Sequence, residues 1–289
     1  MALDGLTISI VIPAKNEAQN LELLLPKLAS NGEFLECIVV DDGSTDETVE
    51  VCNKHGVRVI SNPYSKGNGA AIKTGAKATS GDIIVFMDGD GQHRPEDISR
   101  LLEKIAQGYD MVVGARSRKS QADSYRAMGN GIYNRLARWM TGQKVDDLTS
   151  GFRAVRAEHF KEFLYLLPNG FSYPTTITMA FFRSGFSVGY VSIETERRLG
   201  DSHISLVKDG IRFLIIIFKV GTLYSPLKVF FPVSACFFFT GVCYYLYTFI
   251  SDGRFTNMGA VLFMTAVLVF LIGLVSEQVT TLMYKDENE

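Results

Sequence analysis

Short apolar runs alternate with polar turns and amphipathic stretches from the N-terminus to Gly114. The β-branched runs predict strands, and the stretches with apolar residues every three or four positions predict helices. The predicted strands are Thr7–Ile12, Phe34–Val40, Arg58–Ser61, Asp82–Met87 and Asp110–Gly114. The predicted helices run from Asn16 to Ser30, from the turn at Asp46 to Lys54, and over Gly67–Ala78 and Pro95–Gln107. This alternation indicates an α/β fold, in which a parallel sheet carries helices on both faces.

The pattern beyond Gly114 is less regular. It predicts helices over Arg126–Met140 and near Ala157–Leu166, and a strand over Phe186–Glu194. The segment Ile204–Leu223 mixes lysine and arginine with isoleucine, leucine and phenylalanine. This mixture is typical of an amphipathic helix that lies at a membrane surface.

Two long uncharged stretches lie near the C-terminus, at residues 229–251 and 255–276. A helix rises about 1.5 Å per residue, so each stretch is long enough to cross the hydrocarbon core of about 30 Å. We therefore expect transmembrane helices over Val229–Ile250 and Asn257–Val275. The chain then divides into a catalytic domain at 1–203, a surface helix at 204–225, and a transmembrane part with a short tail at 226–289.

Loop charges predict the orientation of these spans. Basic residues precede the first span and follow the second, whereas the connector carries only Arg254; the flanking basic residues are Lys208, Arg212, Lys219, Lys228 and Lys285. The positive-inside rule therefore places the catalytic domain and both termini in the cytosol. We expect no cleavable signal at Leu6–Ile12, because this run is short and lacks a basic start.

Overall charge and cysteine content narrow the function classes. The chain has 29 basic and 31 acidic residues, a balance that gives no reason to expect a nucleic-acid partner. The four cysteines show no metal-binding spacing, and we expect reduced thiols in a cytosolic setting.

The most informative polar residues follow the fourth predicted strand. Asp88, Asp90 and Gln92 stand two positions apart, so in an extended segment their side chains share one side. Two carboxylates and an amide oxygen suit a hard divalent cation, Mg²⁺ or Mn²⁺. An acidic, glycine-rich turn without a metal is the alternative interpretation.

Polar turns also follow the first two strands. The first contains Asn16 and Glu17, and the second contains the adjacent carboxylates Asp41 and Asp42, which could accept hydrogen bonds from a base or ribose. Lys66 precedes a glycine-rich helix start whose amides could bind phosphate, although a plain turn explains it as well. No G-x-G-x-x-G follows the first strand, which disfavours a Rossmann dinucleotide site.

Four motifs in this order resemble those of family 2 glycosyltransferases, and within these the polyprenyl-phosphate glycosyltransferases of the dolichol-phosphate mannose synthase type. They are Pro13-Ala-Lys-Asn-Glu17, Asp41-Asp-Gly-Ser-Thr-Asp46, Asp88-Gly-Asp-Gly-Gln-His93 and Ser150-Gly-Phe-Arg-Ala154. The resemblance covers about Ile8–His203. It implies a GT-A nucleotide-sugar fold with a mixed, mostly parallel sheet, and a transfer that inverts the anomeric carbon.

The resemblance also implies roles for particular residues. Asp88, Asp90 and Gln92 would hold the metal, and the candidate nucleotide-sugar residues are Pro13, Ala14, Asn16, Glu17, Asp41, Asp42, Lys66, Asp88 and Gly89. Arg116, Arg126, Asn130 and Arg198 would bind the acceptor phosphate, and Asp90, Arg116 and Arg198 are the catalytic candidates. Gly89 and Gly91 replace bulkier residues of the family, and His203 stands where a lysine is common.

The resulting hypothesis is a metal-dependent transfer of a hexose from GDP-mannose or a UDP-hexose to polyprenyl phosphate. A phosphate acceptor is already anionic at neutral pH and needs no general base. The alternative is a glycosyltransferase that acts on a glycan or lipid hydroxyl, with Asp146 or Asp147 as its base. A noncatalytic scaffold or a transporter fits the motifs and the two spans less well. The sugar, the lipid and a homo-oligomeric state stay open.

Overall fold

We analysed a computed structural model of the 289-residue chain. The structure describes residues 5–32, 34–116, 124–170, 172–195, 218–219 and 221–284. The chain divides into two compact units, residues 1–203 and 204–289, and each is described by itself.

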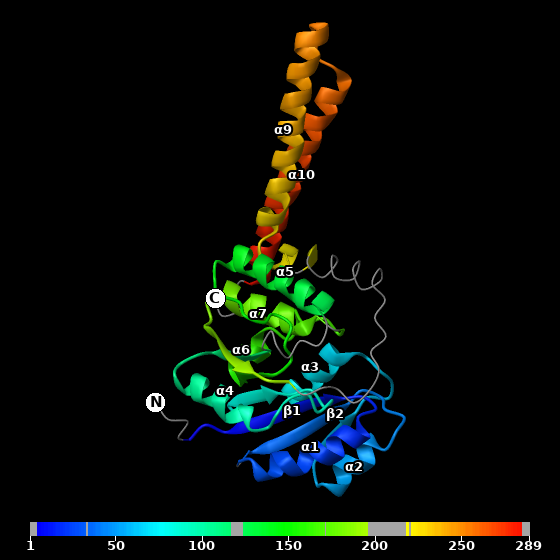
Figure 1. Cartoon of the computed structure of the whole chain (residues 1–289), viewed down its shortest axis with the longest axis vertical. Helices are drawn as coiled ribbons and strands as arrows, with labels where there is room; N and C mark the ends of the chain where they lie inside the picture. Colours follow the sequence, from blue (N-terminus) through cyan, green and yellow to red (C-terminus); the bar gives the residue numbers. More distant parts are fainter. Residues whose placement is uncertain are drawn as a thin grey trace. The chain divides into compact units, whose positions relative to one another are not determined.

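The first unit is built on one seven-stranded sheet (Figure 1). Its strands are β1 (Ile8–Ala14), β2 (Glu36–Asp41), β3 (Arg58–Ser61), β4 (Ile83–Phe86), β5 (Met111–Arg116), β6 (Arg153–Arg156) and β7 (Val188–Ile193). They lie in the order β3-β2-β1-β4-β6-β5-β7. Strand β6 is antiparallel to both of its neighbours, and every other pair is parallel. The predicted α/β class and the mixed, mostly parallel sheet are therefore confirmed.

Helices cover both faces of the sheet (Figure 1). They are α1 (Ala18–Ser30), α2 (Thr48–Lys54), α3 (Asn68–Ala78), α4 (Asp97–Ala106), α5 (Ser124–Thr141), α6 (Ala157–Glu162) and α7 (Tyr173–Arg183). Leucines of α1 and α4 form one apolar core with the inward side chains of β1, β4 and β6. On the opposite face, Gly75 of α3 lies directly over Val11 and Val40, where a larger residue would collide with both. Helices α6 and α7 cover the same face beyond α3.

The sequence prediction missed two elements of this unit, β6 and α7. It also made α6 too long, because the chain turns after Glu162 instead of continuing to Leu166. Strand β6 is short and carries an arginine at each end, so neither alternation nor an apolar run marks it. Helix α7 has a proline in its first turn and three threonines, which carry little helix signal.

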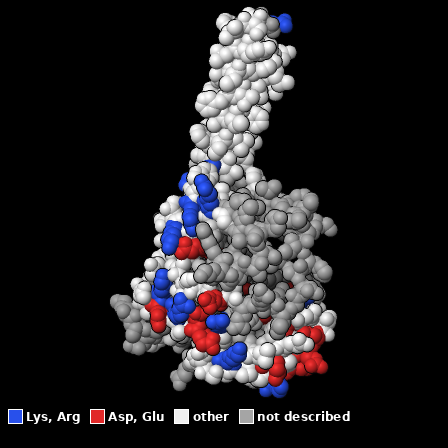
Figure 2. Space-filling model, in the orientation of Figure 1, with Lys and Arg blue, Asp and Glu red and all other residues white. Residues whose placement is uncertain are grey.

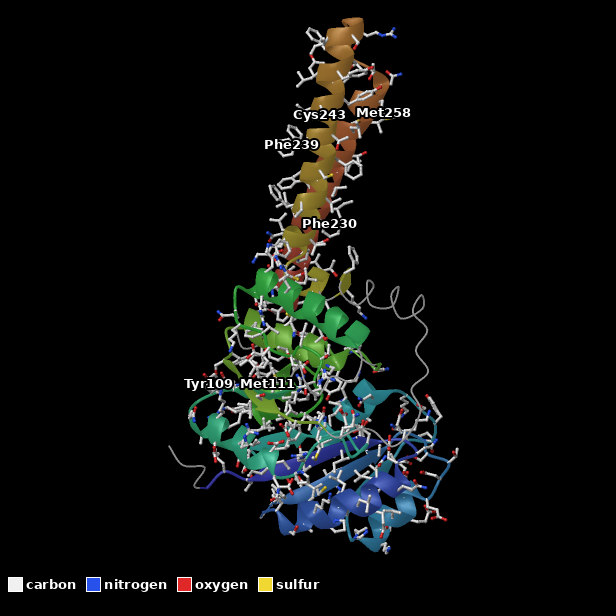
Figure 3. All side chains as sticks on the ribbon, viewed as in Figure 1. Tyr109, Met111, Phe230, Phe239, Cys243 and Met258 are labelled. Atoms are coloured by element: carbon white, nitrogen blue, oxygen red, sulfur yellow. The ribbon has the colours of Figure 1, made fainter. Side chains whose placement is uncertain are left out.

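The second unit contains two long helices, α9 (Pro226–Asp252) and α10 (Asn257–Met283). Both are long and apolar enough to cross a membrane. Figure 2 shows that their surface carries almost no charge along its length. Phe239, labelled in Figure 3, is 65% exposed on the outside of α9. Helix α9 extends beyond the predicted span by less than a turn at each end, and α10 starts where predicted but continues from Val275 to Met283.

Small residues hold these two helices together. A β carbon on Gly273 would lie 2.8 Å from that of Phe230, so only glycine permits this approach. Ser234 Oγ donates to the carbonyl of Ala266 at 2.8 Å, and so crosses from one helix to the other. The carboxylate of Glu277 accepts a hydrogen bond from Leu227 N at 3.1 Å. It satisfies an amide at the start of α9 that would otherwise lack a partner.

Candidate active site

The candidate site lies where β4 ends and β6 begins. Asp88 follows β4 and is half-buried. His93 Nε2 lies 3.7 Å from Asp88 Oδ2, and the His93 ring stacks on Phe152 with centroids 4.9 Å apart. Gly151 lies against the same carboxylate, since a β carbon there would stand 2.7 Å from Asp88 Oδ2. The antiparallel entry of β6 therefore closes one side of Asp88.

Charges around Asp88 keep its carboxylate ionised. Burial raises the pKa of Asp88, but the His93 imidazole and the positive charges of Arg116 and Arg153 outweigh burial. The pKa of Asp88 therefore lies below its ordinary value. An ionised carboxylate is the form that can bind a cation.

Asp90 and Gln92 lie in a turn and not in a strand. Strand β4 ends at Phe86, and Gly91 has φ +71°, which bends the chain. Gln92 N donates to Asp90 Oδ1 at 3.2 Å. The alternation that predicted a shared side for these groups thus stops before Asp88, and a tight loop brings Asp90 and Gln92 together instead.

The candidate donors Asp88, Asp90 and Gln92 would fill only part of the coordination shell of a Mg²⁺-like ion. No group of three or more His, Cys, Asp and Glu side chains suited to a metal is present in the part of the chain that the structure describes. Two carboxylates and an amide, those of Asp88, Asp90 and Gln92, would be the protein donors here. Mg²⁺ typically takes one or two carboxylates and completes its shell with water and substrate phosphates. The residues present therefore fit a cation that binds together with a diphosphate.

A second charged group, Arg116, stands at the end of β5. Its Nε donates to Asp147 Oδ2 at 2.8 Å, and its Nη2 donates to Asp147 Oδ1 at 3.1 Å and to Thr149 Oγ1 at 2.6 Å. The Asp147 side chain is 3% exposed and that of Arg116 is 28% exposed. Burial raises the pKa of Asp147, but the hydrogen bonds and charge of Arg116 lower it further, to below the ordinary range.

A second arginine, Arg153, is completely buried close to the site. Its guanidinium donates to the carbonyls of Ser150 and Pro174 and to Thr178 Oγ1, and it lies 5.8 Å from the centroid of the Tyr173 ring. These contacts fix the loop that carries Gly151. The motif Ser150-Gly-Phe-Arg-Ala154 contains this arginine, but its resemblance to the family implied no role for Arg153.

The turn after β1 is tied to the turn after β2. Asn16 has φ +55°, and its side chain accepts a hydrogen bond from Thr45 N at 2.8 Å. Asn16 N donates to Ser44 Oγ at 2.9 Å, and Glu17 N donates to Thr48 Oγ1 at 3.0 Å. Pro13 and Ala14 close β1 and are buried in front of this turn. The candidate nucleotide residues of the first two motifs thus share one edge of the sheet.

The two adjacent carboxylates after β2 differ in their surroundings. Asp42 accepts four hydrogen bonds from the loop that follows β3, donated by Asn62 Nδ2, Ser65 Oγ, Lys66 N and Gly67 N. Asp41 Oδ1 accepts from Ser44 N at 2.8 Å, while no hydrogen bond to Asp41 Oδ2 occurs among the described residues. Asp42 therefore holds its loop, and Asp41 has the carboxylate oxygen that is more available to a ligand.

The start of α3 is already occupied by the protein itself. Gly69 N donates to the carbonyl of Gly170, and Ala70 N donates to that of Asn169. Lys66 Nζ lies 5.6 Å from the centroid of the Tyr64 ring. The interpretation of this segment as a plain loop-to-helix turn therefore accounts for those amides better than a phosphate site does.

A cleft of about 900 Å³ opens beside Asp90 between α1 and α4. Leu23, Leu24 and Lys27 of α1 line one side, and Arg94 and Arg100 lie near the start of α4. This cleft was not foreseen, because α1 ends at Ser30 and α4 begins only at Asp97.

Three candidate acceptor residues cannot be located in the site. Arg198 lies outside the described residues, as does His203. Arg126 and Asn130 lie on α5, whose backbone is described there, but their side chains are not. Their roles stay predictions.

The sheet order and the acidic loop after β4 define a glycosyltransferase with a GT-A-like fold. The chain belongs to glycosyl transferase family 2, whose domain matches residues 9–164. The match confirms the family inferred from the four motifs, and with it an enzyme that transfers sugar. A separate match, to the GtrB C-terminal hairpin, covers residues 225–282 and so includes α9 and α10.

Relatives extend this similarity. Polyprenol monophosphomannose synthase of Mycolicibacterium smegmatis is 30% identical over 212 residues, which are 68% of this chain and 80% of that protein. An undecaprenyl-phosphate 4-deoxy-4-formamido-L-arabinose transferase of Photorhabdus laumondii is 31% identical over 212 residues, 70% of this chain. The match covers 64% of that second protein, so the rest of the relative lies outside the match.

Solved structures show the same fold. The glucosyl-3-phosphoglycerate synthase of Mycobacterium tuberculosis, in complex with Mg²⁺ and UDP, superimposes with a TM-score of 0.61 at 25% identity. The superposition covers 76% of this chain and 79% of that one. That neighbour binds a divalent cation together with a nucleoside diphosphate.

Proposed function

We propose that this enzyme transfers a hexose from a nucleotide diphosphate sugar, GDP-mannose or a UDP-hexose, to polyprenyl phosphate with inversion at the anomeric carbon. The observation that carries the proposal is the placement of Asp88 and Arg116 at one edge of the sheet. Phe86 of β4 and Val113 of β5 both pair with Arg153 of β6, so Asp88, after β4, and Arg116, at the end of β5, stand at the same end of these strands. The positive charge of Arg116 also contributes to the lowered pKa of Asp88. A candidate cation site and a guanidinium are thus available together. The name of one relative specifies undecaprenyl phosphate, and that of another specifies a polyprenol monophosphomannose product. Both names support the same acceptor class.

The residues around Asp147 favour a phosphate acceptor over a hydroxyl. A hydroxyl must lose its proton to a base, whereas a phosphate monoester is already anionic at neutral pH. Asp147 was a candidate base, but its carboxylate is bound on both oxygens by Arg116 and Thr149. Its lowered pKa makes it a weak base. Asp146 carries its own pair with Lys144 Nζ at 3.1 Å.

Asp88, Asp90 and Gln92 would hold the cation, Mg²⁺ or Mn²⁺. Bound there with the donor diphosphate, it would neutralise charge that develops on the leaving group. Arg116 would bind the acceptor phosphate through N–H groups that Asp147 does not use, with Arg126, Asn130 and Arg198 as further candidates. Asp41 would contact the base or ribose. The turn at residues 13–17 and the loop at residues 62–67, which Asp42 holds, would form the walls of the nucleotide site.

Two apolar helices support action at a membrane. A polyprenyl tail stays in the bilayer, so the catalytic unit must work beside it. Trp139, Arg135 and Lys144 are exposed on or next to α5, and aromatic and basic residues favour the membrane interface. The distribution of basic residues supports a cytosolic catalytic unit. A cysteine placed in the connector at Gly253 should then react with an impermeant reagent from the non-cytosolic side only.

The decisive experiment offers the purified full-length protein a panel of nucleotide sugars together with a short-chain polyprenyl phosphate. We expect one sugar to be transferred and the product to release it in mild acid, as a glycosyl phosphate does. Transfer to a hydroxyl acceptor, with an acid-stable bond, would refute the proposal.

A further inference from the structure

The carboxylate of Asp147 accepts five hydrogen bonds, three from Arg116 and two from Thr149. The Arg116 bonds come from its backbone N, its Nε and its Nη2. The second terminal nitrogen, Nη1, makes no hydrogen bond to any residue that the structure describes. Asp147 therefore binds the guanidinium along its Nε–Nη2 edge and leaves Nη1 without a bond to the described residues.

Helix α5 fixes the loop that carries Asp147. Asn134 Nδ2 donates to the carbonyl of Asp146 at 2.7 Å, and Asn134 Oδ1 accepts from Leu148 N at 3.0 Å. Arg138 Nε donates to the carbonyl of Val145 at 2.8 Å. The backbone is therefore held on both sides of Asp147. The Asp147 carboxylate thus stays in place when the Arg116 side chain moves.

Arg116 has a competing attraction, because the negative charge of Asp88 also acts on it. A free arginine side chain has several rotatable bonds and would be drawn toward the nearest exposed carboxylate. Such a contact would use donors needed for an anion and would occupy a candidate cation ligand. Two parallel hydrogen bonds to a fixed carboxylate oppose that movement.

We propose that Asp147 is a positioning residue, which holds Arg116 by one edge so that Nη1 faces an incoming phosphate and Asp88 stays free for a cation. This inference rests on the proposed function for the identity of that phosphate, which is the head group of the polyprenyl acceptor. Asp147 itself touches neither substrate.

The test compares Asp147→Asn with Asp146→Asn, a neighbouring carboxylate that pairs with Lys144 and Arg138 at the surface. We expect Asp147→Asn to raise the KM for polyprenyl phosphate by roughly tenfold or more, in line with the loss of other orienting partners. The KM for the donor should change less than about twofold, and Asp146→Asn should resemble the parent. An equal rise in both KM values would overturn the proposal.

A double-mutant cycle separates positioning from an independent role. In an Arg116→Ala background, adding Asp147→Asn should raise the KM for polyprenyl phosphate by less than about twofold, because the guanidinium that Asp147 positions is gone. Effects that multiply would show that Asp147 acts apart from Arg116 and would refute the proposal. Should Asp147→Asn fail to fold, Thr149→Val removes the hydroxyl at 2.6 Å from Arg116 Nη2 and should shift the same KM in the same direction. An unchanged KM for Thr149→Val would then count against it.

Chemical footprinting makes this test independent of the proposed function. The Arg116 guanidinium should react slowly with an arginine-directed glyoxal in the parent and in Asp146→Asn, and several-fold faster in Asp147→Asn. Equal rates in all three would overturn the positioning role, even in an enzyme that accepts polyprenyl phosphate. Failure of the parent to use polyprenyl phosphate would instead refute the proposed function. The reaction rates of Arg116 would still test the positioning role of Asp147.

Discussion

Gly151 lies so close to Asp88 that a β carbon on residue 151 would stand 2.7 Å from one carboxylate oxygen and 3.1 Å from the other. The contact joins residues far apart in sequence, and glycine is the residue that leaves Asp88 room. It suggests the first test of the site.

Gly151→Ala should displace the Asp88 carboxylate, since the neighbouring backbone is anchored by Arg153 and cannot retreat. Overpacking of this kind costs about 1–3 kcal/mol. We expect kcat/KM to fall by about tenfold or more and Mn²⁺ to bind more weakly, as measured by electron paramagnetic resonance of the bound ion. Gly170→Ala is the control, because a β carbon there meets no atom within 4 Å. Unchanged Mn²⁺ binding in Gly151→Ala would contradict the assignment of Asp88 as a ligand.

Asp90→Ala should abolish turnover and its dependence on Mg²⁺ or Mn²⁺. The loss should exceed about a hundredfold, because Asp90 supplies one of only two carboxylates in the acidic loop. A chelator should have the same effect on the parent, and added Mn²⁺ should restore activity to the parent alone. Full activity in chelator would remove the cation from the mechanism.

Asp42→Asn should destabilise the catalytic unit by about 1–3 kcal/mol, since it weakens four hydrogen bonds to a buried carboxylate. Burial raises the pKa of Asp42, but these hydrogen bonds outweigh it and lower the pKa. The stabilisation is therefore complete above the unfolded pKa of about 3.9 and is lost as pH falls through the lower folded pKa.

Thermal unfolding, measured from pH 7 down to pH values below the unfolded pKa of Asp42, checks this prediction. The difference in Tm between the parent and Asp42→Asn should be constant near neutral pH and should shrink in acid. Glu47→Gln, at an exposed position, should follow the parent at every pH. A difference that grows in acid would mean that the sign of the Asp42 shift is wrong.

Gly273→Leu should separate the two apolar helices. The added side chain has no space beside Phe230, whose β carbon would lie 2.8 Å from the new one. We expect a disulfide engineered between α9 and α10 to form in the parent and to fail in this variant. Ile272→Leu, on a 52% exposed neighbour, should leave that disulfide intact. An intact disulfide in Gly273→Leu would mean that the helices do not pack through Gly273.

The sequence was sufficient for the parallel half of the sheet because each of its strands is a local signal. Strand β3 was predicted at its exact bounds, and the other predicted strands lie within one or two residues of those found. Alternating polarity and turn residues act over short distances, so these elements can be recognised one at a time.

The relationships inside the site could not be predicted in the same way. The pairs Gly151 with Asp88 and Arg116 with Asp147 exist because β6 inserts between β4 and β5. Insertion of a short strand with charged ends depends on tertiary packing, namely the burial of Arg153 against Tyr173 and Pro174. The motif Ser150-Gly-Phe-Arg-Ala154 did mark this region, but only its resemblance to a family gave it meaning.

The backward course of β6 has a consequence for how this enzyme can evolve. Phe86 pairs with Arg153, so Phe152 points into the core with α1 and α4 while Arg153 points to the opposite face. A shift of the strand by one position would exchange the two faces. The Arg153 guanidinium would then enter the apolar core, and the Phe152 ring would lie among the polar groups that now bind Arg153. An insertion or deletion near this strand must therefore leave the four residues of β6, Arg153–Arg156, in this alignment.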